Sequence, residues 1–162
     1  MTDTVDSQTR SRIMARVRSK DTKPELSVRR ALHAAGFRFR LQARGLPGKP
    51  DLVLPSYRTA VFVNGCFWHW HGCKRSRMPS SNAAYWNAKI SRNIVRDKAT
   101  QAALKGLGWR CVVIWECEIV QGSKRLIRVL QRIKRINENR RIPYVPKSIE
   151  TLCSNSLEKR AK

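Results

Sequence analysis

Cysteine and histidine residues of the kind that bind transition metals are concentrated in one short segment of this chain. Cys66, His71 and Cys73 lie within eight residues, and Cys117 closes a later apolar run. Zinc prefers four sulfur or nitrogen ligands in a tetrahedron, so these residues can form a Cys3His site that staples the loop. The spacing is not that of a standard zinc finger, and ordinary buried thiols beside a surface histidine are the alternative.

A second group of residues could hold a hard cation and move protons. Gly48-Lys49-Pro50-Asp51 places a carboxylate at the start of an apolar run, where it can project into a cleft. Mg²⁺ on such a carboxylate polarises a phosphate and supports an attacking hydroxide, whereas a turn-capping aspartate is the alternative. If the next run pairs with this one, Val63 and Asn64 lie beside Asp51. His69, which zinc does not need, can then donate or accept a proton.

Large aromatic and basic side chains surround these residues in the sequence. Phe67, Trp68 and Trp86 could wedge between base steps of DNA, with core packing as the alternative. A basic stripe on the same predicted helix would hold phosphates and consists of Lys89, Arg92 and Arg96. The aromatics assigned to the core instead are Phe62, Trp109 and Trp115. Trp70 is left undecided between these two roles.

The charge of the chain restricts its partners. Thirty-four lysine and arginine residues oppose eleven aspartate and glutamate residues, which gives a net charge of +23. Such a field favours nucleic acid, bound by phosphate neutralisation, over solubility alone or a membrane surface. The polar N-terminus lacks a secretion signal and the cysteine number is odd, so we expect a cytoplasmic protein whose closely spaced thiols bind metal.

The elements that must position these residues follow from periodicity and punctuation. Thr22-Lys23-Pro24-Glu25 is a capping-box pattern, so Glu25 is either a second active-site carboxylate or the capping partner of Thr22. Apolar spacing predicts helices at 9–19, 24–35, 84–107 and 124–136. Short apolar runs predict strands at 37–41, 51–54, 60–63 and 109–115. The size suits one α/β domain, with an N-terminal arm at 1–20, a central domain at 21–139 and a basic tail at 140–162.

Taken together, the motifs resemble those of the very short patch repair (Vsr) endonucleases over roughly residues 7–135. The matching segments are Thr9-Arg10-Ser11, Asp21-Thr22, Leu46-Pro47-Gly48-Lys49-Pro50-Asp51, Gly65-Cys66-Phe67-Trp68-His69, Gly108-Trp109-Arg110 and Trp115-Glu116-Cys117. The resemblance implies a restriction-endonuclease-like fold, with a central mixed β-sheet flanked by helices and a zinc-stapled loop. It also implies a Mg²⁺-dependent nickase that cuts 5′ to the thymine of a T:G mispair left by deamination of 5-methylcytosine.

The resemblance assigns roles to individual residues. It implies Asp51 and the Val63 carbonyl as magnesium ligands, His69 as the acid/base group and Glu25 as a supporting catalytic group. It implies zinc ligation by Cys66, His71, Cys73 and Cys117. The implied DNA contacts are Met14 in the minor groove, the wedge Phe67, Trp68 and Trp86, and Lys89 and Asn93 near the mispair. Asn64 replaces a histidine of the family pattern and cannot exchange a proton at neutral pH.

Two other functions are weighed against mismatch nicking. One is a related nuclease with a different mispair or site specificity, and the other is a zinc-containing DNA-binding protein without catalysis. For partners we expect double-stranded DNA with a T:G mismatch and a MutL-type mismatch-repair protein, with the protein itself a monomer near the bacterial nucleoid.

Overall fold

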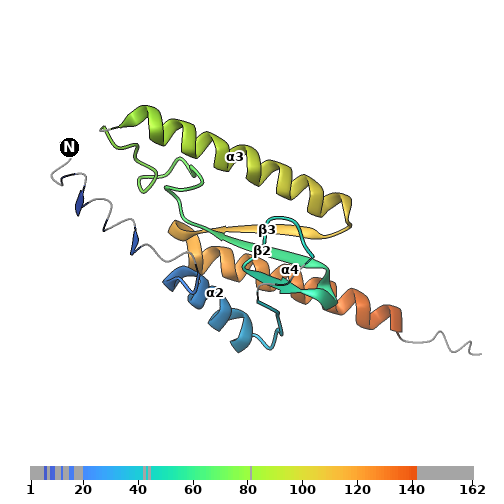
Figure 1. Cartoon of the computed structure of the whole chain (residues 1–162). Coiled ribbons are helices and arrows are strands. Elements are labelled where there is room, and N and C mark those ends of the chain that lie inside the picture. Colours follow the sequence, from blue (N-terminus) through green and yellow to red (C-terminus); the bar gives the residue numbers. More distant parts are fainter. Residues whose placement is uncertain are drawn as a thin grey trace, which may run out of the picture.

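The described part of the chain forms a three-stranded sheet between helices (Figure 1). The computed structural model describes residues 6, 8–9, 12, 15–16, 20–41, 43, 45–80 and 82–141. Its helices are α2 (Lys23–Ala34), α3 (Ala83–Gly106) and α4 (Ile119–Arg141), and its 3₁₀ turns are η1 (Pro55–Tyr57) and η2 (Glu116–Glu118). Its strands are β1 (Leu52–Leu54), β2 (Thr59–Asn64) and β3 (Arg110–Trp115).

Helix α2 begins where the capping-box pattern predicts. The Thr22 hydroxyl accepts a 3.4 Å hydrogen bond from the Glu25 N–H and donates one of 2.8 Å to the Glu25 carboxylate. The first bond satisfies an amide group that the first turn leaves open, the second holds the two side chains together, and Pro24 occupies a position where no N–H is needed. Gly36, with φ of +80°, ends the helix. The predicted helix 24–35 is therefore confirmed to within one residue.

The sheet is mixed, as expected for the central layer. β1 pairs antiparallel with β2, and β2 pairs parallel with β3 in the order β1-β2-β3. The predicted strand at 37–41 is wrong, because only Arg40 pairs, through a single bridge to Val53. β1 is only three residues long, so its outer edge can form main-chain hydrogen bonds with a single partner residue.

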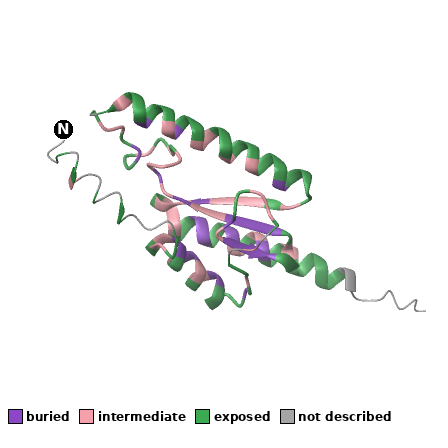
Figure 2. Ribbon diagram, viewed as in Figure 1, coloured by how far each residue is buried: buried purple, intermediate pink, exposed green. Residues whose placement is uncertain are grey.

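The two faces of the sheet are covered unequally. α2 and α4 pack on one face, and α3 spans the other (Figure 1). The buried core lies on the α2/α4 side and is made of Val28, Leu32, Phe37, Leu52, Leu54, Val61, Ile114, Leu126 and Leu130 (Figure 2). Because side chains alternate along a strand, Phe62 and Trp115 point to the α3 side, and both are only half-buried. Trp109 is half-buried too, so assigning these three aromatics to the core was wrong.

The remaining predicted helices are found with shifted ends or lie outside the described residues. α3 matches the prediction 84–107 to within one residue, whereas α4 extends well beyond 124–136 at both ends. Its extra turns are largely exposed, so the apolar pattern alone did not reveal them. The predicted helix 9–19 and the tail 140–162 fall mostly outside the described residues. No described helix is both long and apolar enough to span a bilayer.

Candidate active site and metal centre

A cavity of about 660 Å³ lies between the sheet, the start of α2, the loop before β1 and α3. Its ionisable lining residues are Glu25, Lys49, Asp51, His69, Arg96, Asp97 and Glu116. Phe62, Val63, Asn64 and Val113 form its floor. The incomplete cover of this face of the sheet therefore leaves room for a ligand where the sequence places its candidate catalytic groups.

Asp51 is a partly desolvated carboxylate just before β1. One of its oxygens accepts a 2.7 Å hydrogen bond from the Val63 N–H, and no described group bonds the other. Burial raises the pKa of Asp51, the Val63 hydrogen bond opposes this, and the Glu25 carboxylate adds to it. In a strand the N–H and C=O of one residue face the same neighbour, so the Val63 carbonyl lies on the Asp51 side of β2. A carboxylate and a carbonyl that share a site suit a hard divalent cation.

His69 is oriented by a carboxylate that the sequence analysis missed. Its Nδ1 is hydrogen-bonded to the Asp97 carboxylate of α3. The other ring nitrogen, Nε2, is therefore the one available for proton exchange in the cavity. Asp97 is the single acidic residue of α3, in a helix otherwise rich in lysine and arginine. That isolated charge was the signal that could have identified it.

Glu25 is the capping partner of Thr22 and also lies at the candidate active-site cavity. Its carboxylate lines the cavity, yet it also accepts hydrogen bonds from the Thr22 hydroxyl, the Asp21 N–H and the Arg29 guanidinium. With only 5% of its surface exposed and both oxygens engaged, it is held in one position. The charge of Glu25 acts on Asp51, and Arg29 partly offsets it.

The loop that carries Asp51 approaches α3 closely at Gly48. A Cβ at this position would lie 2.1 Å from the Thr100 side chain, and φ is +74°. We expect Gly48→Ala to lower the free energy of unfolding by about 2–4 kcal/mol, through the clash and the strained backbone. Thermal unfolding measures this.

Two further variants test whether the clash and the strained backbone at Gly48 cause this loss of stability. Adding Thr100→Ala removes the clashing methyl and should restore part of the loss. Gly106→Ala is the matched control, because nothing lies within 4 Å and φ is ordinary there. It should stabilise α3 by about 0.5–1 kcal/mol. Wild-type stability in Gly48→Ala would contradict the close approach.

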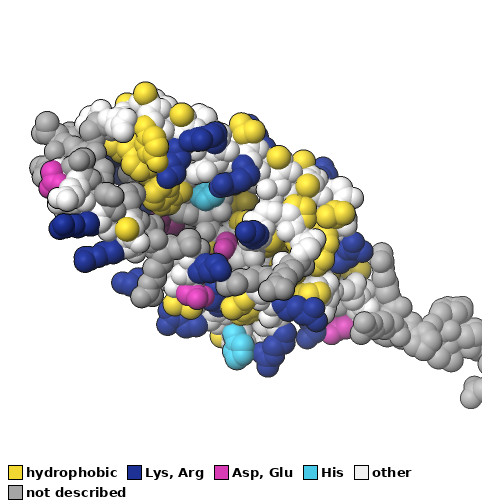
Figure 3. All heavy atoms as spheres, viewed as in Figure 1, with side chains coloured by type: hydrophobic (Ala, Val, Ile, Leu, Met, Phe, Trp, Pro, Cys, Tyr) yellow, Lys and Arg dark blue, Asp and Glu magenta, His cyan; other side chains and the backbone are white. Residues whose placement is uncertain are grey.

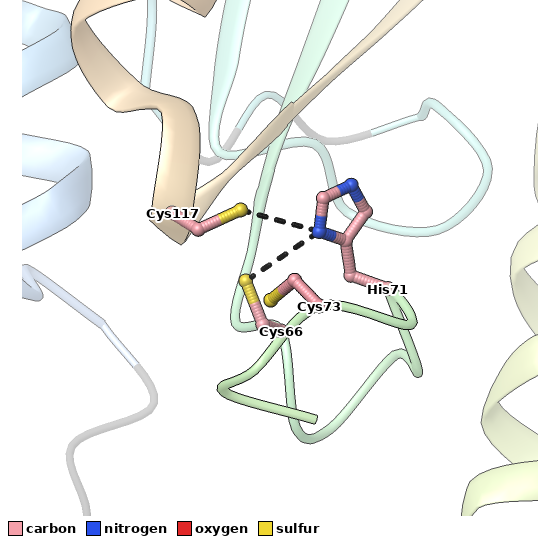
Figure 4. A group of neighbouring side chains, drawn as sticks. All are labelled: Cys66, His71, Cys73 and Cys117. Carbon is pink, nitrogen blue, oxygen red and sulfur yellow. Dashed lines mark hydrogen bonds between the residues drawn. The ribbon is translucent and has the colours of Figure 1, made fainter. Parts of the chain in front are cut away.

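The four predicted zinc ligands converge (Figure 4). Their ligand atoms all lie within 4.8 Å of one another, with Cys117 Sγ 3.2 Å from His71 Nδ1. Cys117 comes from η2 and the other three from the loop after β2. Cys117 is exposed and Cys73 half-buried, so these are not ordinary buried thiols.

The protonation chemistry of the cluster also suits a soft cation. Burial raises the pKa of the Cys66 thiol to about 12, so that thiolate needs a positive charge beside it. The hydrogen bond from His71 is the main cause that lowers the pKa of Cys73 to about 6. The His71 ring stacks on Trp115 at 4.5 Å between centroids, which ties the loop to β3. Three thiols and an imidazole are a donor set that zinc accepts.

The predicted wedge residues form one aromatic cluster. Phe67 lies 5.1 Å from Trp68 and 5.2 Å from Trp86, centroid to centroid, and the Lys89 ammonium is 5.3 Å from the Trp68 ring. Trp86 is buried, while Phe67 and Trp68 are half-buried. Figure 3 shows a patch of hydrophobic side chains over this end of α3, with lysine and arginine side chains beside it.

Other predicted contacts are placed nearby. Arg92 and Arg96 are exposed on α3. The Asn93 amide donates to the Trp68 carbonyl at 2.8 Å and accepts from Arg96 at 3.1 Å, so it is occupied within the protein. Trp70 is 41% exposed with φ of +52°. Met14 lies outside the described residues.

Known proteins share this sequence over most of its length. A family profile described as DNA mismatch endonuclease Vsr matches residues 2–75. The type II nicking enzyme V.XorIIP of Xanthomonas oryzae is 50% identical over 119 residues, which cover 74% of this chain and 88% of the relative. V.NmeAIP of Neisseria meningitidis, also a type II nicking enzyme, is 41% identical over 83% of this chain and 98% of its own. The DNA mismatch endonuclease Vsr of Escherichia coli is 38% identical over 78% and 80%, respectively.

Proposed function

Since the chain belongs to the Vsr family of DNA mismatch endonucleases and nicking enzymes, we propose that the Asp51 cavity is where it hydrolyses one strand of a DNA duplex. The observation that carries this proposal is the presence of a partly desolvated Asp51 and an Asp97-oriented His69 in one cavity. Family membership makes the chain an endonuclease, so the alternative of a DNA-binding protein without catalysis is rejected.

Magnesium fits the hard-cation site of this proposal. Asp51 and the Val63 carbonyl would hold it, because the free Asp51 oxygen is desolvated beside a second carboxylate. When bound, the ion would polarise the phosphate and make a water molecule easier to deprotonate.

Side chains of the protein then transfer the proton and align the reacting groups. Asp97 holds the His69 ring through Nδ1, which leaves Nε2 to exchange a proton with water or with the leaving oxygen. Asn64 lines the same cavity and is 7% exposed. It can orient a water or a phosphate oxygen but cannot take its proton. His69 is therefore the single imidazole in the proposed mechanism.

Recognition of a weak base step is assigned to the aromatic cluster. Phe67, Trp68 and Trp86 would enter the stack from the major groove, where a mispaired step costs least to open. Lys89, Arg92 and Arg96 would hold phosphates, and Met14 would contact the minor groove from the arm at 1–20. Asn93 would act near the mispair by holding the Trp68 main chain.

Zinc is proposed as a structural ion at Cys66, His71, Cys73 and Cys117. With four protein ligands it has no open position for water, so its task is to fix the loop. The restriction-endonuclease-like fold, the catalytic domain at 21–139 and the basic tail at 140–162 remain part of the same proposal, as does a MutL-type partner.

The relatives further restrict which DNA substrates are proposed for this chain. Most of those named above are type II nicking enzymes, which favours a nuclease with its own mispair or site specificity. A nick 5′ to the thymine of a T:G mispair is the first specificity to test.

A panel of duplexes decides between these specificities. It contains T:G in several flanking sequences, other mispairs and matched controls, and nicked strands are mapped on sequencing gels. We expect Mg²⁺-dependent nicking of one strand beside a mispair in a preferred sequence. Absence of nicking across the panel would overturn the proposed function, and equal nicking of matched duplexes would overturn the mispair requirement.

The Asp97 to His69 contact yields a separate prediction. Asp97→Asn should lower the single-turnover nicking rate by about 10²- to 10⁴-fold, because the ring loses its orientation and its stabilising charge. DNA affinity should change little, since the carboxylate faces the imidazole. Glu118→Gln, which changes a carboxylate outside the cavity, is the matched control. A wild-type rate in Asp97→Asn would show that the contact has no part in catalysis.

A further inference from the structure

A second hollow of about 560 Å³ lies at the far end of α3, outside the proposed catalytic cavity. It is formed by the turn after η1, the last turns of α3 and the start of β3. Its lining includes three cations, Arg58, Lys105 and Arg110, and two aromatic residues, Tyr57 and Trp109. Among the described residues, no aspartate or glutamate lines it. A concave surface with cations and no carboxylate attracts an anion.

The cations are arranged before any ligand arrives. Arg58 adopts φ of +42°, and its guanidinium donates a 2.9 Å hydrogen bond to the Leu107 carbonyl. This bond uses one of five guanidinium N–H groups, so the others remain for a ligand. The Arg110 N–H donates to the Arg58 carbonyl at 2.7 Å, which fixes the two residues side by side. Lys105 and Arg110 form no ion pair with any described carboxylate.

The hollow and the proposed catalytic cavity both border α3. Gln101 lines both spaces. Asp97, Gln101 and Lys105 are four residues apart in turn, so their side chains share a face of the helix. The eight residues from Asp97 to Lys105 correspond to about 12 Å of helix rise. One DNA strand rises about 3.4 Å per nucleotide along the duplex axis and also winds around that axis, so this length spans at most about three nucleotides.

We propose that this hollow binds a backbone phosphate of the DNA strand, within about three nucleotides of the phosphate at the proposed catalytic cavity. The inference rests on the proposed function, because it takes DNA as the substrate. The cations neutralise the phosphodiester, and the contact fixes the register of the strand along α3 without reading a base. A free phosphate ion has the same chemistry, so the test separates a phosphate in the strand from one in solution.

The experiment measures DNA binding without Mg²⁺, so that no strand is cut. Lys105→Ala/Arg110→Ala removes two cations from the hollow and leaves Arg58 to bind the Leu107 carbonyl. We expect affinity to fall by about three- to tenfold and the salt slope of log K to decrease by about one. Lys124→Ala/Arg128→Ala is the matched control, since it removes two exposed cations from α4, on the opposite side of the sheet.

A neutral methylphosphonate placed at single positions of the duplex locates the contact. In the wild type, affinity should fall when the substitution lies at one position within about three nucleotides of the nick on one side. The double variant should be less sensitive to that substitution, because two of the three partner charges are already gone. Inorganic phosphate at matched ionic strength should not reproduce the loss.

Three results would overturn the proposal. They are an equal loss of salt slope in the α4 control, equal sensitivity of wild type and double variant to every methylphosphonate, and competition by inorganic phosphate alone. Failure of the proposed function is visible separately, as an absence of nicking by the unaltered protein with Mg²⁺ on the duplex panel.

Discussion

Asp51→Asn should abolish nicking while DNA binding survives. Asparagine keeps the shape of the side chain but removes the charge that would hold a divalent cation beside the Val63 carbonyl. Loss of several kcal/mol of transition-state stabilisation corresponds to a rate at least about 10³-fold lower. Single-turnover nicking at saturating protein measures the rate, and a gel or anisotropy titration without Mg²⁺ measures the affinity. Nicking at the normal rate by the purified variant would remove Asp51 from the mechanism.

The same variant should unfold at a higher temperature in the absence of a divalent cation. Burial raises the pKa of Asp51 in the folded protein, so the folded state favours the protonated carboxyl more than the unfolded chain does. At neutral pH, above the ordinary range of the group, the ionised form therefore costs folding stability, and asparagine removes that cost. This advantage should shrink as the pH falls through the raised pKa.

Glu138→Gln provides the control for the stability measurement. Glu138 is exposed on α4 and is far in sequence from the residues that line the cavity. Its replacement should leave both the nicking rate and the unfolding temperature nearly unchanged. If Asp51 only capped a turn, its replacement would lower stability, because a turn cap would be lost. An Asp51→Asn protein that is more stable but inactive therefore excludes a merely structural role.

Loss of zinc should have the second large effect, on stability and activity together. Cys117→Ala removes the ligand that joins the loop at 66–73 to the end of β3. That loop has one fully buried apolar side chain, Cys66 itself, so a metal bond would supply most of its order. We expect the free energy of unfolding to fall by about 3–5 kcal/mol, or about 10–15 °C in Tm. The zinc content should fall from one ion per chain to a smaller amount that is weakly bound.

Nicking should fall as well, since His69, Phe67 and Trp68 lie on the stapled loop. Cys111→Ala is the matched control, because Cys111 is a half-buried thiol outside the cluster. That variant should keep one zinc and most of its stability. Stoichiometric zinc and wild-type Tm in Cys117→Ala would show that the four side chains do not act as a ligand set.

Much of the local structure follows from residue types at short range. Thr22, Pro24 and Glu25 specify the start of α2 because capping is decided within one turn. The three strands of the sheet follow from short apolar runs between turn residues, and Gly36 and Gly108 mark two helix ends through positive φ. The Cys3His cluster was also predictable, since closely spaced cysteine and histidine residues are the types that bind transition metals.

The set of residues that line the candidate active-site cavity depended on tertiary structure. His69 and Asp97 are 28 residues apart, and no local pattern links a loop histidine to the middle of α3. The unequal cover of the two faces decided that Phe62 borders the cavity and that Trp115 packs on His71 instead of in the core. The sequence left two possible roles open for Glu25, and only packing placed it beside Asp51 and Arg29.

The sequence by itself determined the ligand types, the charge and the short-range caps, because these depend on residue chemistry within a few positions. Only the tertiary structure decided which carboxylate orients the histidine, which face of the sheet stays open and which cations line the hollow beyond Gln101. Those features arise where α3 crosses the sheet, and long-range packing, not local propensity, sets that crossing.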